Sequence, residues 1–191
     1  HGDVVDGRNF PGGGFEYCAQ PGPPYLHDCR LDLSGAFLAH LHERPMQPMG
    51  WATRANFATL PQARYVPGGF EPRFGLCRFA YAYVPSACWA DVAACGLHVH
   101  YHGCGAGGLT DPSSLLWTEL PHWAEANGIV VLYPQAVPAP GNVNGCWDWW
   151  GFTGNDFDTH QGVQLRTVLA MAADLRRVLA ETGGRMVEED A

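Results

Sequence analysis

In the second half of the chain, hydrophobic side chains recur with two different periods. Where they recur at every second position, the pattern predicts β-strands. Residues 79–84 alternate aromatic with small side chains, and residues 97–102 form a second short run, so we expect a strand in each. A further strand is expected near 56–60. Residues 129–133 are continuously apolar, which is typical of a parallel strand buried on both faces.

Helices are predicted where apolar side chains recur three and four positions apart, over 32–43, 114–126 and 161–181. Asn127-Gly128 is a typical helix end. The last helix has its apolar stripe at Leu165, Val168, Leu169, Ala172, Leu175 and Leu179.

Strand, helix, buried strand and helix follow one another over 79–181, and this βαβα order predicts an open α/β sheet. With 191 residues the chain has the length of one domain, which we take to be 1–191. Residues 1–30 are rich in glycine and proline and are expected to form a loop closed by cysteines.

Composition narrows the function. The chain has 24 glycines, 15 prolines, no lysine and a net charge of −8, so it lacks the basic surface of a nucleic-acid binder. A neutral substrate would not be repelled by that charge. There is no run of about 20 apolar residues, so we expect no membrane-spanning helix.

Seven cysteines are dispersed among aromatic and Gly/Pro-rich segments without a C-x-x-C pair, which favours disulfides in a secreted protein over a zinc or redox motif. Because seven is odd, one thiol lacks a partner within this chain.

A glycine-rich turn, residues 102–108, follows a predicted strand and precedes a predicted helix. Such a turn supplies one oxyanion-hole N–H in α/β-hydrolases, and it is equally consistent with a plain connection. It is not a phosphate-binding loop, because the P-loop lysine is missing.

Histidines offer two other candidate sites. His98, His100 and His102 share one face of a strand and are either packed core residues or ligands of zinc or copper; we expect no metal. His1 is a general base, a copper ligand together with a terminal amine, or an exposed residue without a role.

Residues 146–150 form an unusually aromatic loop, which either binds an apolar or sugar surface or acts as a hydrophobic lid. The four serines, Ser34, Ser86, Ser113 and Ser114, all lie outside a G-x-S-x-G motif.

Five segments together resemble the esterase family of poly(3-hydroxybutyrate) depolymerases. They are Tyr83-Val84-Pro85, Leu97-His98-Val99, His102-Gly103-Cys104, residues 123–136 and Asn144-Gly145-Cys146-Trp147-Asp148-Trp149. The resemblance implies the α/β-hydrolase fold, a Ser-His-Asp triad and extracellular hydrolysis of polyesters, without a cofactor. It points to a circularly permuted branch, in which the serine-bearing half comes first.

By resemblance, His1 is the catalytic base, the Cys104 N–H stabilises the oxyanion, and Trp149 and Trp147 line the substrate crevice. The resemblance also implies three disulfides, Cys18–Cys29, Cys88–Cys95 and Cys104–Cys146, and it leaves Cys77 unpaired.

The triad serine and aspartate have no counterpart here, so we expect an incomplete α/β-hydrolase domain that is inactive alone and needs the missing N-terminal half. Two alternatives stay open: a non-catalytic module that binds a polyester or another apolar surface, and a copper site on His1 resembling that of copper polysaccharide monooxygenases.

Overall fold

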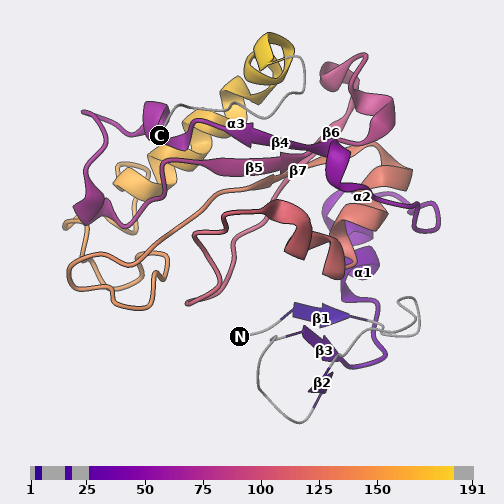
Figure 1. Ribbon diagram of the computed structural model, residues 1–191, viewed down its shortest axis with the longest axis horizontal. Coiled ribbons are helices and arrows are strands. Elements are labelled where there is room, and N and C mark those ends of the chain that lie inside the picture. The colour runs from indigo at the N-terminus through magenta and orange to yellow at the C-terminus, as the bar shows by residue number, and fades with distance from the viewer. Residues whose placement is uncertain (1–2, 6–15, 19–25, 183–191) are drawn as a thin grey trace.

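The computed structural model describes residues 3–5, 16–18 and 26–182, and its centre is a mixed four-stranded sheet with helices on both faces (Figure 1). The strand order is β4-β5-β7-β6, with β4 and β7 antiparallel to β5 and β6 parallel to β7. The strands are β4 (Phe57–Leu60), β5 (Ala80–Tyr83), β6 (Gly96–Val99) and β7 (Ile129–Tyr133).

Alternating side chains divide the core into two layers. Even-numbered residues of β5 and β7, such as Ala82 and Leu132, pack against α3 (Val163–Thr182). Odd-numbered ones, such as Tyr83 and Val131, pack against α1 (Leu33–Leu41) and α2 (Leu120–Asn127). The continuous apolar run at 129–133 therefore serves both faces of the sheet, as predicted for a buried strand.

The predicted helix over 114–126 is wrong as a single element. The structure has a 3-10 helix, η7 (Pro112–Trp117), then extended backbone at Thr118, and then α2. Pro121 lies in the first turn of α2, where its missing N–H costs nothing; inside a longer helix it would have broken a backbone bond. Gly128 ends α2 in the left-handed conformation, as the Asn127-Gly128 pair predicted.

The apolar stripe of α3 is also shifted from the prediction. Val168, Met171, Leu175 and Leu179 are buried, whereas Leu169 is 49% exposed. Successive residues of a helix are about 100° apart, so Leu169 cannot share the face of Val168.

The described residues of the region 1–30 include three short strands, which the sequence pattern did not predict. β1 (Asp3–Val5), β3 (Leu26–Asp28) and β2 (Glu16–Tyr17) form a small parallel sheet in the order β1-β3-β2, beside α1 (Figure 1). Cys18 and Cys29, which follow the register pair of Tyr17 with Asp28, are disulfide-bonded.

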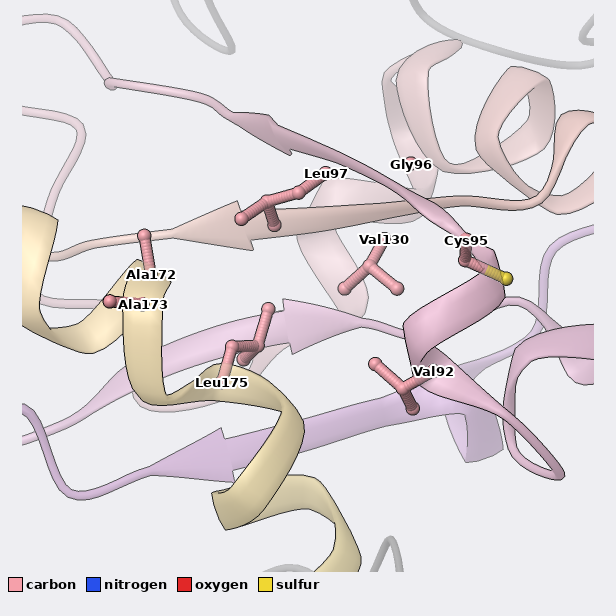
Figure 2. Close-up of a pocket in the computed structure, with 8 residues that line it drawn as sticks. All are labelled: Val92, Cys95, Gly96, Leu97, Val130, Ala172, Ala173 and Leu175. Atoms are coloured by element: carbon pink, nitrogen blue, oxygen red, sulfur yellow. The ribbon is translucent and has the colours of Figure 1, made fainter.

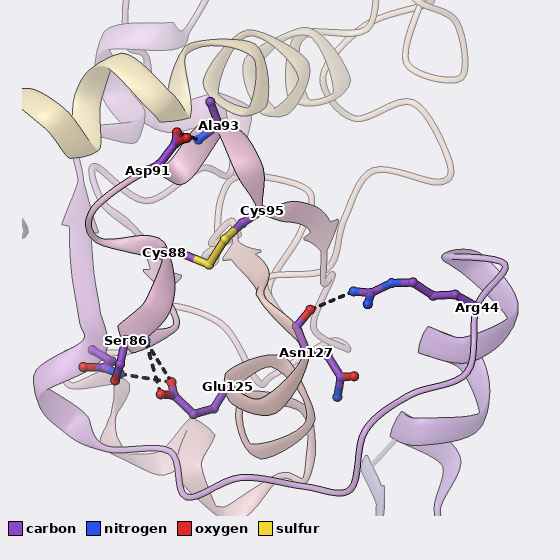
Figure 3. Close-up of a disulfide and its surroundings, with 9 residues drawn as sticks. Arg44, Ser86, Cys88, Asp91, Ala93, Cys95, Glu125 and Asn127 are labelled. Atoms are coloured by element: carbon purple, nitrogen blue, oxygen red, sulfur yellow. Dashed lines mark hydrogen bonds between the residues drawn. A yellow bond between two sulfur atoms is a disulfide. The ribbon is translucent and has the colours of Figure 1, made fainter.

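A second disulfide, Cys88–Cys95, closes the connection between β5 and β6 (Figure 3). Next to it, Glu125 on α2 accepts hydrogen bonds from the Tyr83 hydroxyl (2.5 Å) and the Ser86 N–H (3.2 Å). These bonds attach α2 to the end of β5. Arg44 donates to the Asn127 carbonyl (2.7 Å) and so holds the segment after α1 against the end of α2 (Figure 3).

Other 3-10 turns connect these elements: η2 (Arg54–Asn56), η3 (Gln62–Tyr65), η4 (Pro72–Phe74), η5 (Ser86–Cys88) and η6 (Val92–Ala94). None of the described helices is long and apolar enough to cross a bilayer.

Candidate functional site

The glycine-rich turn and the aromatic loop meet at the carboxyl ends of the parallel strands β6 and β7. The predicted strand over 97–102 ends at Val99, after which the chain leaves the sheet and enters the turn at Gly103. β7 likewise ends at Tyr133 and leads through Pro134 toward the aromatic loop. This edge of an open α/β sheet is where ligands usually bind.

His102 holds the turn in place. Its Nε2 accepts the Ala136 N–H (2.9 Å), so the ring proton is on Nδ1, which donates to the Gly103 carbonyl (2.8 Å). Burial lowers the pKa of His102 and outweighs the opposing effect of the Gly103 bond. The imidazole is therefore neutral near pH 7 and acts as a bridge between the two loops.

The N–H of Cys104 is one of the backbone donors that the turn leaves without an acceptor among the described residues. The N–H of Ala106 is bonded to the Gly103 carbonyl, and the N–H of Gly105 to the Asn144 carbonyl (2.7 Å). Cys104 is exposed, and its N–H has no acceptor among the residues that the structure describes. An exposed, rigidly held N–H of this kind can donate to an oxygen that becomes negatively charged during a reaction.

A third disulfide, Cys104–Cys146, connects this turn to the aromatic loop. Asn142 holds the second cysteine: its side chain donates to the Cys146 carbonyl (2.8 Å) and accepts the Cys146 N–H (2.9 Å). The three disulfides are those implied by the resemblance, and Cys77 is free.

The two tryptophans expected to line a crevice occupy different environments. Trp147 is partly buried, with its ring 4.9 Å from that of Tyr101 and 5.5 Å from that of His102. Trp149 is 74% exposed and contacts the ring of Trp150 (5.3 Å). Trp147 thus forms part of the support of the turn, and Trp149 is the aromatic group presented to solvent.

The histidine row does not form one cluster. His98 stacks on Phe37 (5.3 Å between ring centroids), and His102 lies beyond the end of β6. Within the described ranges, no group of three histidine, cysteine or acidic side chains is arranged to hold a metal ion. Burial, with smaller contributions from His100 and His42, lowers the pKa of His98 to about 4.

We expect His98 to make stability depend on acid pH. Its folded-state pKa lies below the ordinary value of 6.5, so the unfolded chain binds the proton first, and stability present above pH 6.5 is lost as pH falls toward 4. Replacement by phenylalanine, His98→Phe, should flatten the unfolding free energy between pH 6.5 and 4 in urea titrations. His40→Gln, at an exposed histidine, is the control; a His98→Phe profile as steep as that of His40→Gln would contradict the assignment.

Two predicted features have another outcome. His1 lies outside the described residues, so its role as base or copper ligand stays a prediction. None of the four serines is hydrogen-bonded to a histidine in the described part of the chain.

Sequence reasoning missed two polar residues that organise the site. Gln135 is buried, and its side chain accepts the Leu109 N–H (3.2 Å), which holds the end of the glycine-rich turn. The Asp148 carboxylate accepts the N–H groups of Gly151 and Thr153, which directly follow the aromatic loop. For Asp148 a signal was available, since aspartate shortly before glycine is typical of side-chain-stabilised turns.

A cavity of about 270 Å³ lies elsewhere, between α3, η6 and the edge strand β6 (Figure 2). Its lining consists of Val92, Cys95, Gly96, Leu97, Val130, Ala172, Ala173 and Leu175. Its lining has no titratable side chain, because Cys95 is in a disulfide, so it offers no acid, base or nucleophile.

Comparisons with known proteins relate this chain to polyhydroxybutyrate depolymerases. The chain is 38% identical over 172 residues to a poly(3-hydroxybutyrate) depolymerase of Delftia acidovorans, and 29% identical over 181 residues to a polyhydroxybutyrate depolymerase of Talaromyces funiculosus. Each alignment covers 87% of this chain, but only 32% and 51% of those proteins. No protein-family model matches.

Two solved structures share the fold. One is a PHB depolymerase in complex with an R3HB trimer (TM-score 0.73), and the other is the PHB depolymerase of Penicillium funiculosum (TM-score 0.71). Both are 28% identical to this chain; 90% of this chain aligns with 55% and 56% of theirs. The sequence relationship and the shared fold lead to one conclusion: this chain is similar in sequence and in fold to part of the poly(3-hydroxybutyrate) depolymerases, of whose length it spans about a third to a half.

Proposed function

We propose that this chain is part of an extracellular carboxylic-ester hydrolase of the polyhydroxyalkanoate depolymerase type. The observation that carries the proposal is the uncommitted Cys104 N–H, joined by the Cys104–Cys146 disulfide to the loop that exposes Trp149. The turn would hold the reacting carbonyl, and the tryptophan would hold the polyester. The disulfides suit a secreted protein.

The proposed reaction uses a Ser-His-Asp triad. A serine hydroxyl attacks the ester carbonyl while His1, as general base, takes its proton; the same proton is later returned to the leaving alcohol, and water hydrolyses the acyl-enzyme. The Cys104 N–H donates to the oxyanion, and loss of one such donor costs about 10²–10³ in rate. The serine and aspartate would come from outside these 191 residues, so this chain alone should be inactive.

A polyester surface fits the aromatic loop. Poly(3-hydroxybutyrate) is uncharged and rich in methyl groups, so an indole ring can bury apolar area against it without desolvating a charge. Trp149 is 74% exposed and has a ring neighbour in Trp150, which offers such a contact.

Removal of this ring should weaken adsorption. We expect Trp149→Ala to bind poly(3-hydroxybutyrate) granules at least ~10-fold more weakly than the unsubstituted chain, in the range of an aromatic anchor at an interface. Adsorption isotherms of the 191-residue chain measure this directly.

Trp51→Ala is the matched control, because Trp51 is 80% exposed and contacts His122 rather than the aromatic loop. Equal losses in both variants would indicate unspecific adsorption and contradict the role of Trp149.

The same samples address the alternative of a non-catalytic binding module. If adding the serine-bearing portion of a relative restores hydrolysis of a short-chain ester, this result supports the esterase. Hydrolysis by the chain alone would overturn the assignment of the nucleophile.

A further inference from the structure

The aromatic loop is organised by one carboxylate. Asp148 Oδ1 accepts the N–H groups of Trp150 (3.2 Å), Gly151 (2.7 Å) and Phe152 (3.2 Å). Its Oδ2 accepts both the N–H (2.9 Å) and the hydroxyl (2.7 Å) of Thr153. Four consecutive backbone donors and one hydroxyl thus converge on a single side chain, which lies between Trp147 and Trp149 in the sequence.

Only an ionised carboxylate satisfies this arrangement. All five groups donate, and aspartate is the short side chain with two oxygens that only accept. Partial burial raises the pKa of Asp148, but the hydrogen bonds from Thr153 and the loop N–H groups more than offset it, so the pKa falls below the usual value. The carboxylate is therefore charged near neutral pH.

The residue is itself fixed to the core. The Asp148 N–H donates to Gln164 Oε1 (2.8 Å), and Gln164 Nε2 donates to the Phe74 carbonyl (2.8 Å). Gln164 is buried in the first turn of α3. Gln164 on α3 thus fixes the backbone of Asp148, and the Asp148 carboxylate in turn fixes residues 150–153.

Exposed rings bind best when they are held before contact, because otherwise binding must pay for ordering them. The ring centroids of Trp149 and Trp150 are 5.3 Å apart, and those of Trp150 and Phe152 are 5.1 Å apart. Trp149 precedes the carboxylate-bound segment directly. We propose that Asp148 is the positioning residue that presents the Trp149–Trp150 pair to the polyester; its consequence for binding rests on the proposed function.

The test replaces Asp148 by asparagine, Asp148→Asn, which keeps the shape but turns one oxygen into an NH₂ facing donors. We expect hydrogen exchange of the amides of residues 150–153 to be at least ~10-fold faster, because the loop opens locally more often. Granule adsorption should fall at least ~10-fold, toward that of Trp149→Ala. Asp156→Asn removes the same charge from an exposed position between the aromatic loop and α3 and should change neither.

If Asp148→Asn fails to fold, Thr153→Val removes a single bond to Oδ2 and should give a smaller effect of the same direction. Unchanged exchange at 150–153 in the folded variants would overturn the positioning role. A different outcome is also informative. If exchange is faster in Asp148→Asn but adsorption is unchanged in both Asp148→Asn and Trp149→Ala, the positioning role is supported and the proposed polyester contact is contradicted.

Discussion

Removal of the Cys104–Cys146 disulfide, by the double substitution C104A/C146A, is expected to lower the free energy of unfolding by about 4 kcal/mol. The cysteines are 42 residues apart in sequence, and the chain entropy released by opening a loop of that length corresponds to about 4 kcal/mol. Urea denaturation of the unsubstituted chain and of C104A/C146A, under non-reducing conditions, measures this difference in the free energy of unfolding.

The control is the double substitution C18A/C29A, which opens a loop of 11 residues outside the site and should cost about 3 kcal/mol. Stability alone therefore separates the two variants only modestly. The amide of Gly105, bonded to the Asn144 carbonyl across the disulfide, distinguishes them: its hydrogen exchange should accelerate in C104A/C146A alone. Unchanged exchange there would mean that the Asn142 and Asn144 contacts hold the turn without the crosslink.

The second large effect is expected at Gly107. A Cβ there would lie 2.1 Å from the Ala136 carbonyl oxygen and 2.3 Å from Cε1 of His102. Neither neighbour can retreat easily, because the oxygen is backbone and the imidazole is bonded to the Ala136 N–H and the Gly103 carbonyl. Gly107→Ala should therefore cost about 3 kcal/mol or more and displace the turn that carries the Cys104 N–H.

Gly105→Ala is the matched control from the same turn. Gly105 has a φ of +77°, and a methyl group added to its Cα would meet no atom within 4 Å. Alanine there incurs only the left-handed backbone penalty of about 1–2 kcal/mol. Thermal or urea unfolding compares the two variants. Equal losses would show that the contact with His102 and Ala136 yields more readily than the geometry implies.

Local patterns predicted most of the elements. The alternation over 79–84 and the apolar run over 129–133 correspond to β5 and β7, and the helical spacing over 32–43 and 161–181 corresponds to α1 and α3. Each of these signals is carried by neighbours in the sequence, so no distant contact is needed to read it.

Elements that depend on distant partners were predicted less well. β6 is shorter than the run over 97–102, because its pairing with β7 stops near Leu132 and Tyr101 turns to pack on Trp147. Whether an apolar residue at the end of a strand stays in the sheet depends on what lies opposite, and the residues opposite β6 belong to β7, beyond η7 and α2 in the chain.

The candidate site divides in the same way. From the sequence by itself came the glycine-rich turn, the aromatic loop and, through the family resemblance, the disulfides that appear in the structure. Only the tertiary structure decided that His102 bridges to Ala136, that Trp147 packs while Trp149 is exposed, and that Asp148 collects the loop N–H groups. Residue type states what a side chain can donate or accept; which partner it meets is determined by the folding of segments far apart in sequence.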